Sequence, residues 1–118
     1  MNKSDSVVII PTYNEKENIE NIINAVFALP VMFDVLIIDD NSPDGTAAIV
    51  ERMQKQWDSR LHLLKRSGKL GLGTAYIMGF KWCLIAGYEF IIEMDADFSH
   101  PPKKLLELRQ ACLAGADG

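Results

Sequence analysis

The sequence predicts an α/β fold with a doubly wound, mainly parallel sheet built in the order β-α-β-α-β-α-β-α. Apolar strand-like runs alternate four times with segments whose apolar residues recur at helical spacing, and no Gly/Ser linker or repeat interrupts them. The strand-like runs are continuously apolar, as is typical of parallel strands buried on both faces. With 118 residues, 48% of them hydrophobic, the chain has the size and composition of one globular domain.

The first strand and the first helix are predicted from clear start and stop signals. Residues 7–10 form a β-branched run that Pro11 closes. Asn14 can cap the following helix, and Glu17 completes a capping box three residues later. Apolar residues at helical spacing then continue this helix until Pro30 stops it.

The remaining elements follow the same alternation. Further strands are expected at residues 35–38, 61–64 and 88–94. Ser42 and Pro43 supply a cap and a first helical residue for the second helix. The third helix covers residues 71–86 and contains one charged residue, Lys81, so we expect it to be largely buried. The last helix follows residues 99–102.

Charge and cysteine content exclude several classes of protein. The net charge is −4 and basic residues gather only in the short segment 65–69, so we expect no nucleic-acid partner. Cys83 and Cys112 lack metal-ligand spacing, and we interpret them as buried free thiols in a reducing compartment. No apolar stretch reaches the ~18 residues of a transmembrane helix, and no signal-peptide pattern is present. These features predict a cytoplasmic location.

Carboxylates follow the predicted strands at the edge where parallel α/β sheets bind ligands. Asp95 and Asp97 follow the fourth strand with the small Ala96 between them, so both carboxylates can point the same way. Mg²⁺ and Mn²⁺ prefer such oxygen ligands. Asp39 and Asp40 follow the second strand, and carboxylates gathered at one edge repel each other unless a cation offsets them. The pattern therefore indicates a divalent metal site.

The same loops also have a purely structural interpretation. Asn, Asp, Ser and Pro are common turn formers and helix caps, and this applies most clearly to Asn41, Ser42 and Pro43. His100 lies close to the carboxylate pair and is a candidate for contact with a metal or a substrate, whereas His62 within a strand is interpreted as structural. Both interpretations of the loops remain open here.

Residues 65–74 combine glycines with basic side chains. The glycines are Gly68, Gly71 and Gly73, and the basic residues are Lys65, Arg66 and Lys69. Backbone amides and positive charge in this segment could bind a phosphate, with Lys69 as a candidate contact. The spacing matches neither the P-loop nor the dinucleotide fingerprint. The alternative is that the glycines only permit a tight turn between a strand and a helix.

Four segments match motifs of a known family: residues 8–15, 37–46, 69–76 and 94–101. Together they resemble glycosyltransferase family 2 and, within it, the dolichyl-phosphate (polyprenyl-phosphate) mannosyltransferases. The first two motifs are typical of family 2 broadly. The third and fourth are typical of the polyprenyl-phosphate branch, and the resemblance covers nearly the whole chain.

The resemblance implies a GT-A (Rossmann-like) fold and inverting, metal-dependent transfer of mannose from GDP-mannose to a polyprenyl or dolichyl phosphate. It implies donor-nucleotide contacts at Pro11, Tyr13, Glu15, Ile38, Asp40, Asp95, Ala96 and Asp97. Asp95 and Asp97 are the implied catalytic and metal-binding residues, with Mg²⁺ or Mn²⁺ as the cofactor. Ser99 stands where some family members have Gln, which puts a metal role for this position in doubt. The resemblance also implies contact with the cytoplasmic face of a membrane.

Family 2 mannosyltransferase domains of this kind are considerably longer than this chain. We therefore expect residues 1–118 to be the N-terminal nucleotide-sugar-binding part of a single GT-A domain, truncated at its C-terminus. Such a part would lack the acceptor contacts and would be inactive alone. Its uncovered apolar surface would favour self-association into a homo-oligomer.

Three other functions are compatible with the sequence. A family 2 transferase that uses a UDP-sugar for glycan synthesis would share the first two motifs. A phospho-receiver signalling domain is also acidic and doubly wound, but receivers place paired acids after the first strand, where this chain has Pro11, Thr12 and Tyr13. A binding or scaffold module without catalytic activity is the third, because a fold alone does not define a function.

Overall fold

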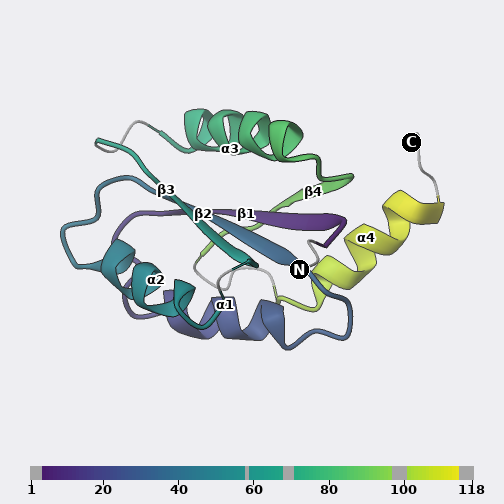
Figure 1. Ribbon diagram of the computed structural model, residues 1–118, viewed down its shortest axis with the longest axis horizontal. Coiled ribbons are helices and arrows are strands. Elements are labelled where there is room, and N and C mark those ends of the chain that lie inside the picture. The colour runs from purple at the N-terminus through teal and green to yellow at the C-terminus, as the bar shows by residue number, and fades with distance from the viewer. Residues whose placement is uncertain (1–3, 58, 68–70, 97–100, 115–118) are drawn as a thin grey trace.

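The structure, a computed structural model, describes residues 4–57, 59–67, 71–96 and 101–114 (Figure 1). Within these residues the strands are β1 (Ser6–Thr12), β2 (Asp34–Asp39), β3 (Leu61–Lys65) and β4 (Phe90–Glu93). The helices are α1 (Ile19–Phe27), α2 (Thr46–Gln54), α3 (Leu72–Ala86) and α4 (Lys104–Ala114). This order confirms the predicted α/β class and its alternation of strands and helices.

All strand pairs are parallel, and the sheet has the order β3-β2-β1-β4. The chain adds β2 and β3 on one side of β1 and then crosses to the other side for β4. Helices α1 and α2 therefore cover one face of the sheet and α3 covers the opposite face (Figure 1). The order reverses between β1 and β4, and in open parallel sheets ligands bind at the carboxyl ends of the strands beside such a reversal.

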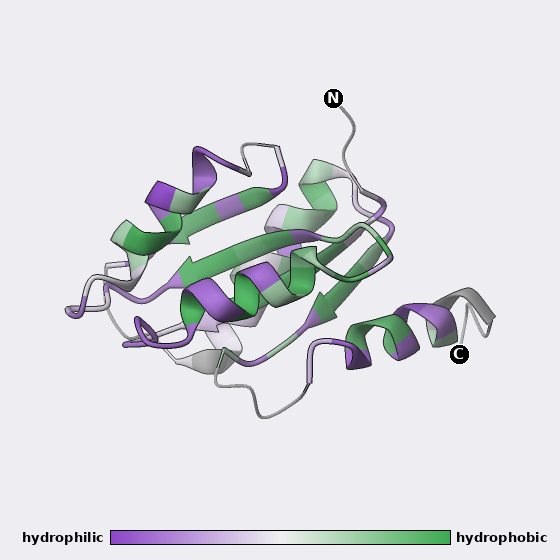
Figure 2. Ribbon diagram, turned by 90° about the horizontal axis from the view of Figure 1, so that it is seen from below, coloured by the Kyte–Doolittle hydropathy of each residue, from purple (hydrophilic) through white to green (hydrophobic). Residues whose placement is uncertain are grey.

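The two central strands are buried on both faces. In β1, Val8 and Ile10 pack toward α1 and α2, whereas Val7 and Ile9 pack toward α3. All six residues of β2 are buried as well. Figure 2 shows these strands in the hydrophobic colour along most of their length. The two-sided burial explains why both strands are continuous apolar runs in the sequence.

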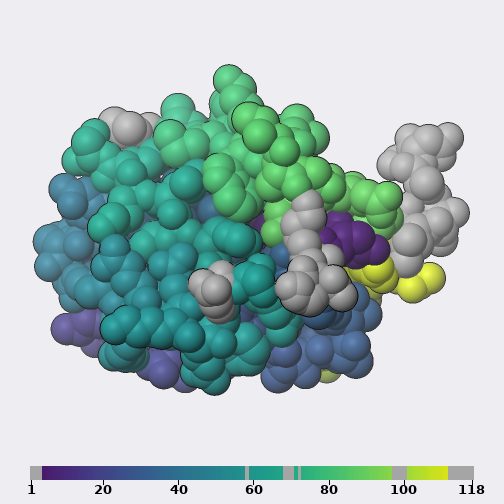
Figure 3. All heavy atoms as spheres, viewed as in Figure 1, coloured from purple at the N-terminus to yellow at the C-terminus, as the bar shows by residue number. Residues whose placement is uncertain are grey.

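Only one side of α3 is buried. Its outward side carries Ile77, Phe80, Leu84 and Ile85, which are 58%, 46%, 55% and 89% exposed. In Figure 3 the green atoms of this part of the chain form the upper surface of the molecule. The expectation of a largely buried helix is therefore wrong for this side: the scarcity of charge on α3 reflects an apolar outer surface as well as core contacts. Self-association through such a surface stays a prediction.

Helices α1 and α2 begin later than the sequence predicts. Helix α1 begins at Ile19, and Asn14 instead adopts a left-handed φ of 57° and donates its backbone N–H to Ser42 Oγ. Helix α2 begins at Thr46 after Gly45, whose φ of 92° suits glycine. The two predicted caps, Asn14 and Ser42, therefore bond to each other and not to the helices that follow them.

Two further expectations concern cysteine and membrane-spanning segments. Cys83 is a buried free thiol, and burial raises its pKa to about 12. The side chain of Cys112 lies outside the part of the molecule described in detail. Among the described residues, no helix is both long enough and apolar enough to span a bilayer.

Gly79 lets α3 approach β1 and β2 closely. A Cβ at this position would lie 2.7 Å from Ile38 Cδ1 and 2.9 Å from Ile9 Cγ2. We expect Gly79→Ala to lower the free energy of unfolding by about 1–3 kcal/mol, because overpacking outweighs the gain in helix propensity. Gly73→Ala is the control in the same helix, since its Cβ would meet nothing within 4 Å. Urea denaturation measures the free energy of unfolding of both variants, and an equal change in the two would contradict the role of close packing at Gly79.

A buried carboxylate lies at the opposite, amino edge of the sheet. Asp34 is fully buried and accepts a hydrogen bond from the Tyr88 hydroxyl at 2.6 Å. Arg60 Nε lies 3.9 Å from Asp34 Oδ1, which is too far for a hydrogen bond. Burial raises the pKa of Asp34 above its ordinary value of 3.8, and the opposing effects of Tyr88, His62 and Arg60 do not cancel it.

The raised pKa of Asp34 makes a signed prediction about stability. As the pH rises past 3.8, the unfolded chain loses this proton before the folded protein does, so the carboxyl group lowers the free energy of unfolding. We expect Asp34→Asn to gain stability relative to the unsubstituted chain as the pH rises from about 3 to about 7. Urea denaturation across this range tests it, and a pH-independent difference would contradict the raised pKa.

Candidate functional site

The ends of β1, β2 and β4 meet at the carboxyl edge of the sheet. Backbone hydrogen bonds continue past the strands: Asp40 N donates to Thr12 O at 3.1 Å, and Met94 N donates to Ile9 O at 3.0 Å. These bonds bring the chain at Asp40 to one side of the β1 end and the chain at Asp95 to its other side. The reversal between β1 and β4 thus has a carboxylate-bearing segment on each side.

Pro11 can occupy the central strand because the pairing with β4 has already ended. The last pair between β1 and β4 joins Ile9 to Glu93. Alternate residues of a parallel strand bond to the same neighbour, so the nitrogen of Pro11, which carries no hydrogen, faces the side beyond the end of β4. Pro11 therefore lies on the side of β1 where Asp95 leaves the sheet.

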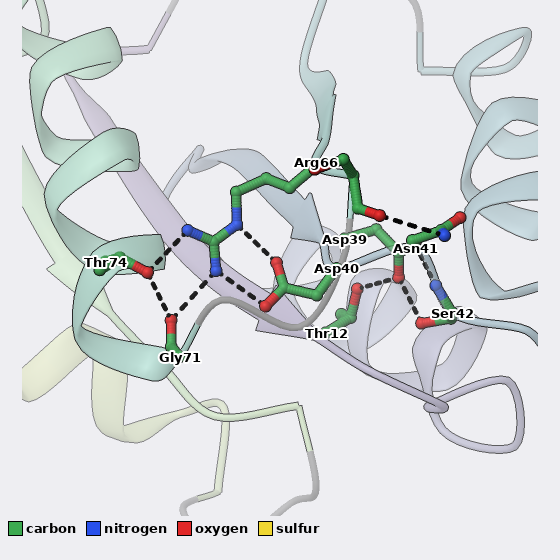
Figure 4. Close-up of polar contacts among 9 residues, drawn as sticks. Thr12, Asp39, Asp40, Asn41, Ser42, Arg66, Gly71 and Thr74 are labelled. Atoms are coloured by element: carbon green, nitrogen blue, oxygen red, sulfur yellow. Dashed lines mark hydrogen bonds and ion pairs between the residues drawn. The ribbon is translucent and has the colours of Figure 1, made fainter.

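Asp39 is buried and accepts three hydrogen bonds. Thr12 Oγ1 donates at 2.7 Å, Ser42 N donates at 2.9 Å and Ser42 Oγ donates at 2.6 Å (Figure 4). The carboxylate joins the end of β1 to the loop after β2. Asp39 thus has a structural role at this edge.

The loops after β1 and β2 are joined by three inter-loop hydrogen bonds. The backbone N–H groups of Asn14, Glu15 and Lys16 donate to Ser42 Oγ, Thr46 Oγ1 and Asp44 Oδ2 at 2.8, 3.0 and 3.1 Å. Asp44 also accepts hydrogen bonds from the backbone N–H and hydroxyl of Thr46. The interpretation of Ser42 as a helix cap is therefore wrong, because its side chain bonds to the preceding loop and to Asp39.

Asp40 is paired with Arg66, which follows β3 directly. Arg66 Nε and Nη2 donate to the two carboxylate oxygens at 2.6 and 2.7 Å, and the two side chains are only 3% and 9% exposed (Figure 4). The hydrogen bonds to Asp40 raise the pKa of Arg66. Arg66 also donates to Thr74 Oγ1 and to Gly71 O at 2.8 and 3.0 Å. The expectation that Arg66 offers its charge to a phosphate is not supported, because these protein groups engage its guanidinium.

Asp95 lies just past β4 and is half-buried. The hydroxyl of Tyr76, on α3, donates to Asp95 Oδ1 at 3.1 Å. Burial, together with the negative charge of Asp95, raises the pKa of Tyr76, so its hydroxyl keeps its proton at neutral pH. Ala96, the next residue in the sequence, is buried. Helix α3 thus holds one oxygen of a predicted metal ligand.

The structure places most of the described candidate residues at one edge. Those at the carboxyl ends of β1, β2 and β4 are Pro11, Tyr13, Glu15, Asp40, Asp95 and Ala96. The side chain of Ile38 is fully buried beneath α3, so a nucleotide would have to contact its backbone. Lys69, Asp97, Ser99 and His100 lie outside the described residues, and their roles stay predictions.

Protein groups offset the described carboxylates of this edge. Asp39 accepts three hydrogen bonds, Asp40 pairs with Arg66 and Asp44 bonds to Thr46. Mutual repulsion therefore does not by itself require a cation. Among the described residues, no three His, Cys, Asp or Glu side chains are grouped to hold a metal. Asp95 still suits a hard cation, because a carboxylate has about four acceptor positions and can bind a metal while accepting a hydrogen bond.

Three residues that build this edge were not predicted as partners from the sequence. They are Thr12, Arg66 and Tyr76, which bond to Asp39, Asp40 and Asp95. The strand register carries a signal for one of them. Asp39 of β2 pairs with Lys65 of β3 in the parallel ladder. The residues that follow the two strands, Asp40 and Arg66, are therefore side by side. Tyr76 had no such signal, because its contact depends on how α3 crosses the sheet.

The sequence profile described as Glycosyl transferase family 2 matches residues 7–118. The chain belongs to this family. The matched region includes all the strands and helices described above and leaves out only Ser6, the first residue of β1. Membership of glycosyl transferase family 2 also overturns the phospho-receiver alternative.

Two curated relatives of this family 2 chain share almost half of its residues. It is 46% identical to the polyprenol monophosphomannose synthase of Mycolicibacterium smegmatis over 95% of this chain and 42% of the relative. It is 44% identical to the undecaprenyl-phosphate mannosyltransferase of Micrococcus luteus over 89% of this chain and 43% of the relative. The chain thus spans less than half the length of each of these relatives.

Solved structures share the arrangement of strands and helices. The mannosyltransferase PcManGT from Pyrobaculum calidifontis, in complex with GDP-Man and Mn²⁺, aligns with a TM-score of 0.71 and 27% identity, over 81% of this chain and 28% of that chain. Residues 1–349 of S. aureus TarS, in complex with UDP-GlcNAc, align with a TM-score of 0.72 and 25% identity, over 90% of this chain and 30% of that chain. These glycosyltransferase neighbours confirm the predicted GT-A class.

Asp39 provides a test of the structural interpretation of this edge. We expect Asp39→Asn to lower the free energy of unfolding by about 1–3 kcal/mol, because an amide N–H₂ replaces an oxygen that accepts from Thr12 or Ser42. Glu51→Gln is the matched control, since Glu51 is exposed and pairs with the exposed Lys65 in a salt bridge worth about 0–1 kcal/mol. Urea denaturation compares them, and an equal loss in both variants would contradict the buried role of Asp39.

Proposed function

We propose that this chain is the nucleotide-sugar-binding part of a polyprenyl-phosphate mannosyltransferase that uses GDP-mannose as its donor. The observation that carries the proposal is its 46% and 44% identity, over most of its length, to two proteins named for mannosyl transfer on polyprenyl phosphates. The similar mannosyltransferase bound to GDP-Man and Mn²⁺ supports the choice of donor and metal.

The proposed donor site lies across the reversal between β1 and β4. The nucleoside would contact the loops after β1 and β2, which carry Tyr13, Glu15 and Asp40. The diphosphate would lie at the end of β4, near Asp95 and Asp97. A Mg²⁺ or Mn²⁺ ion held by Asp95 and Asp97 would supply positive charge to the departing diphosphate.

The proposed acceptor is itself the nucleophile. A phosphate monoester carries about −1.5 to −2 charges at neutral pH, so one of its oxygens can attack the anomeric carbon without a strong general base. The new carbon–oxygen bond forms as the bond to the diphosphate oxygen breaks, GDP leaves with the electron pair, and the configuration inverts. The residues of this chain therefore need to bind and orient the donor rather than activate a nucleophile. In this proposal the acceptor is in a membrane, at its cytoplasmic face.

A UDP-sugar donor is the second candidate. The structural neighbour bound to UDP-GlcNAc has the same overall arrangement as the neighbour bound to GDP-Man, so the fold does not select between the two bases. The identity to the two polyprenyl-phosphate relatives favours mannose and therefore the guanine nucleotide. Nucleotide preference separates the two candidates directly.

Thermal unfolding of the chain with GDP, GDP-mannose, UDP and UDP-GlcNAc, each with and without Mn²⁺, tests the proposal. A ligand at about 100 times its dissociation constant adds about 2.7 kcal/mol, which raises the Tm of a domain of this size by several degrees. We expect Mn²⁺-dependent stabilisation by the guanine nucleotides only.

Asp95→Asn and Asp97→Asn should each remove the Mn²⁺ dependence of this stabilisation. Asp97→Ala should abolish transfer by the complete enzyme with its fold intact.

Glu89→Gln is the control for these variants, because the exposed Glu89 directly precedes β4 and donates its backbone N–H to Asp5 O, at the opposite, amino edge of the sheet. This variant should bind nucleotides like the unsubstituted chain. Stabilisation by uridine nucleotides would instead support the UDP-sugar candidate. The assignment of Asp95 and Asp97 would be wrong if both variants kept full Mn²⁺-dependent stabilisation.

A further inference from the structure

Arg66 has an unusual place for an arginine of this chain. It follows the edge strand β3, yet its side chain is only 3% exposed. Its backbone N–H donates to Asp39 O at 2.8 Å, so the residue is itself anchored to the end of β2. By comparison, the neighbouring Lys65 is an exposed cation that pairs with Glu51 at the surface. The fold thus removes one of two adjacent basic side chains from water.

Within the described residues, the guanidinium of Arg66 makes four hydrogen bonds to three residues. Two of them go to the separate oxygens of Asp40, and the other two go to Thr74 Oγ1 and Gly71 O (Figure 4). Thr74 Oγ1 also donates to Gly71 O at 2.9 Å. A guanidinium has five N–H donors in a fixed planar fork, so these contacts define the orientation of the Asp40 carboxylate as well as its position.

Arg66 therefore joins two parts of the proposed donor site. Asp40 lies beside the proposed nucleoside position, whereas Gly71 and Thr74 form the start of α3. About half a turn further along α3, Tyr76 donates to Asp95, beside the proposed diphosphate position. The start of α3 is thus a common support for Asp40, through Arg66, and for Asp95, through Tyr76.

We propose that Arg66 is a positioning residue that orients Asp40 for the donor nucleoside and couples it to the start of α3. The coupling to α3 follows from the contacts of Arg66 alone. The role in nucleoside binding rests on the proposed function. A lysine cannot replace Arg66 in this role, because an ammonium has no planar fork with which to hold both carboxylate oxygens and reach Thr74 and Gly71 at once.

Arg66→Lys tests this role, with Arg109→Lys as a matched control. Arg109 also pairs with a carboxylate, Asp5, and bonds to Ser6 Oγ, but it lies on α4 at the opposite edge. Calorimetric titration with GDP and with UDP in the presence of Mn²⁺ gives affinity and base preference. We expect Arg66→Lys to weaken GDP binding by at least about tenfold and to reduce the preference for GDP over UDP. Arg109→Lys should change neither quantity.

An affinity loss in Arg66→Lys that is no greater than in Arg109→Lys, with an unchanged base preference, would overturn the role in nucleoside binding. A merely structural Arg66 would lower the Tm without changing the base preference. The comparison with Arg109→Lys therefore separates positioning from general loss of stability.

Amide hydrogen exchange without nucleotide tests the coupling independently of the proposed function. Asp40→Asn should increase exchange at residues 74–76, at the start of α3, and leave exchange at the end of that helix unchanged. Thr74→Val should increase it at the same residues, because it removes one acceptor of Arg66. Unchanged exchange in both variants would overturn the coupling, even if the chain binds no nucleotide. Increased exchange in a chain that binds no nucleotide would support the coupling while contradicting the proposed donor site.

Discussion

Helices cover β1 and β2 on both faces, and this two-sided burial decides where polar groups can lie in the molecule. The apolar side chains of both strands pack against α1 and α2 on one face and against α3 on the other. Burying a polar group there without a hydrogen-bond partner would cost about 2–7 kcal/mol. Functional side chains are therefore confined to the strand ends, and the reversal between β1 and β4 makes the carboxyl edge the place for a ligand.

Each end of β2 carries a buried aspartate with an arginine beside it, but the two pairs differ in geometry. At the carboxyl end, Arg66 binds both oxygens of Asp40 at 2.6 and 2.7 Å. At the amino end, Arg60 Nε stays 3.9 Å from Asp34, and Tyr88 supplies the short hydrogen bond. A buried charge needs close, directional partners to offset the loss of water. At the carboxyl end, the planar guanidinium of Arg66 meets this requirement by bonding to both oxygens of Asp40. At the amino end, Arg60 forms no such pair with Asp34, and the pKa of Asp34 is raised.

The sequence was sufficient for the fold class and for the order of the elements, because continuous apolar runs and helical spacing are local signals. Helix starts were less predictable. Asn14 and Ser42 have the chemistry of caps, and only the approach of the two loops in three dimensions shows that they bond to each other. The outer side of α3 was misjudged because periodicity distinguishes a core face only when the opposite face is polar.

The candidate site was predictable to the level of its strand ends. Asp40 and Asp95 were found because they follow apolar runs, but their partners Arg66 and Tyr76 come from other elements. The roles of Asp97 and Lys69 depend on the family resemblance and remain predictions. The choice of nucleotide depends on side chains around the base, which no periodic pattern encodes.

The inter-loop hydrogen bonds have a consequence for the thermodynamics of ligand binding. Asn14, Glu15 and Lys16 each use a backbone donor that would otherwise be hydrated, so the loop after β1 is ordered before any ligand arrives. Fixing a single backbone residue costs about 1–2 kcal/mol of conformational entropy at room temperature. For this loop, that cost is met during folding. A nucleotide that contacts Tyr13 and Glu15 can then convert more of its contact energy into affinity, as for any preorganised receptor.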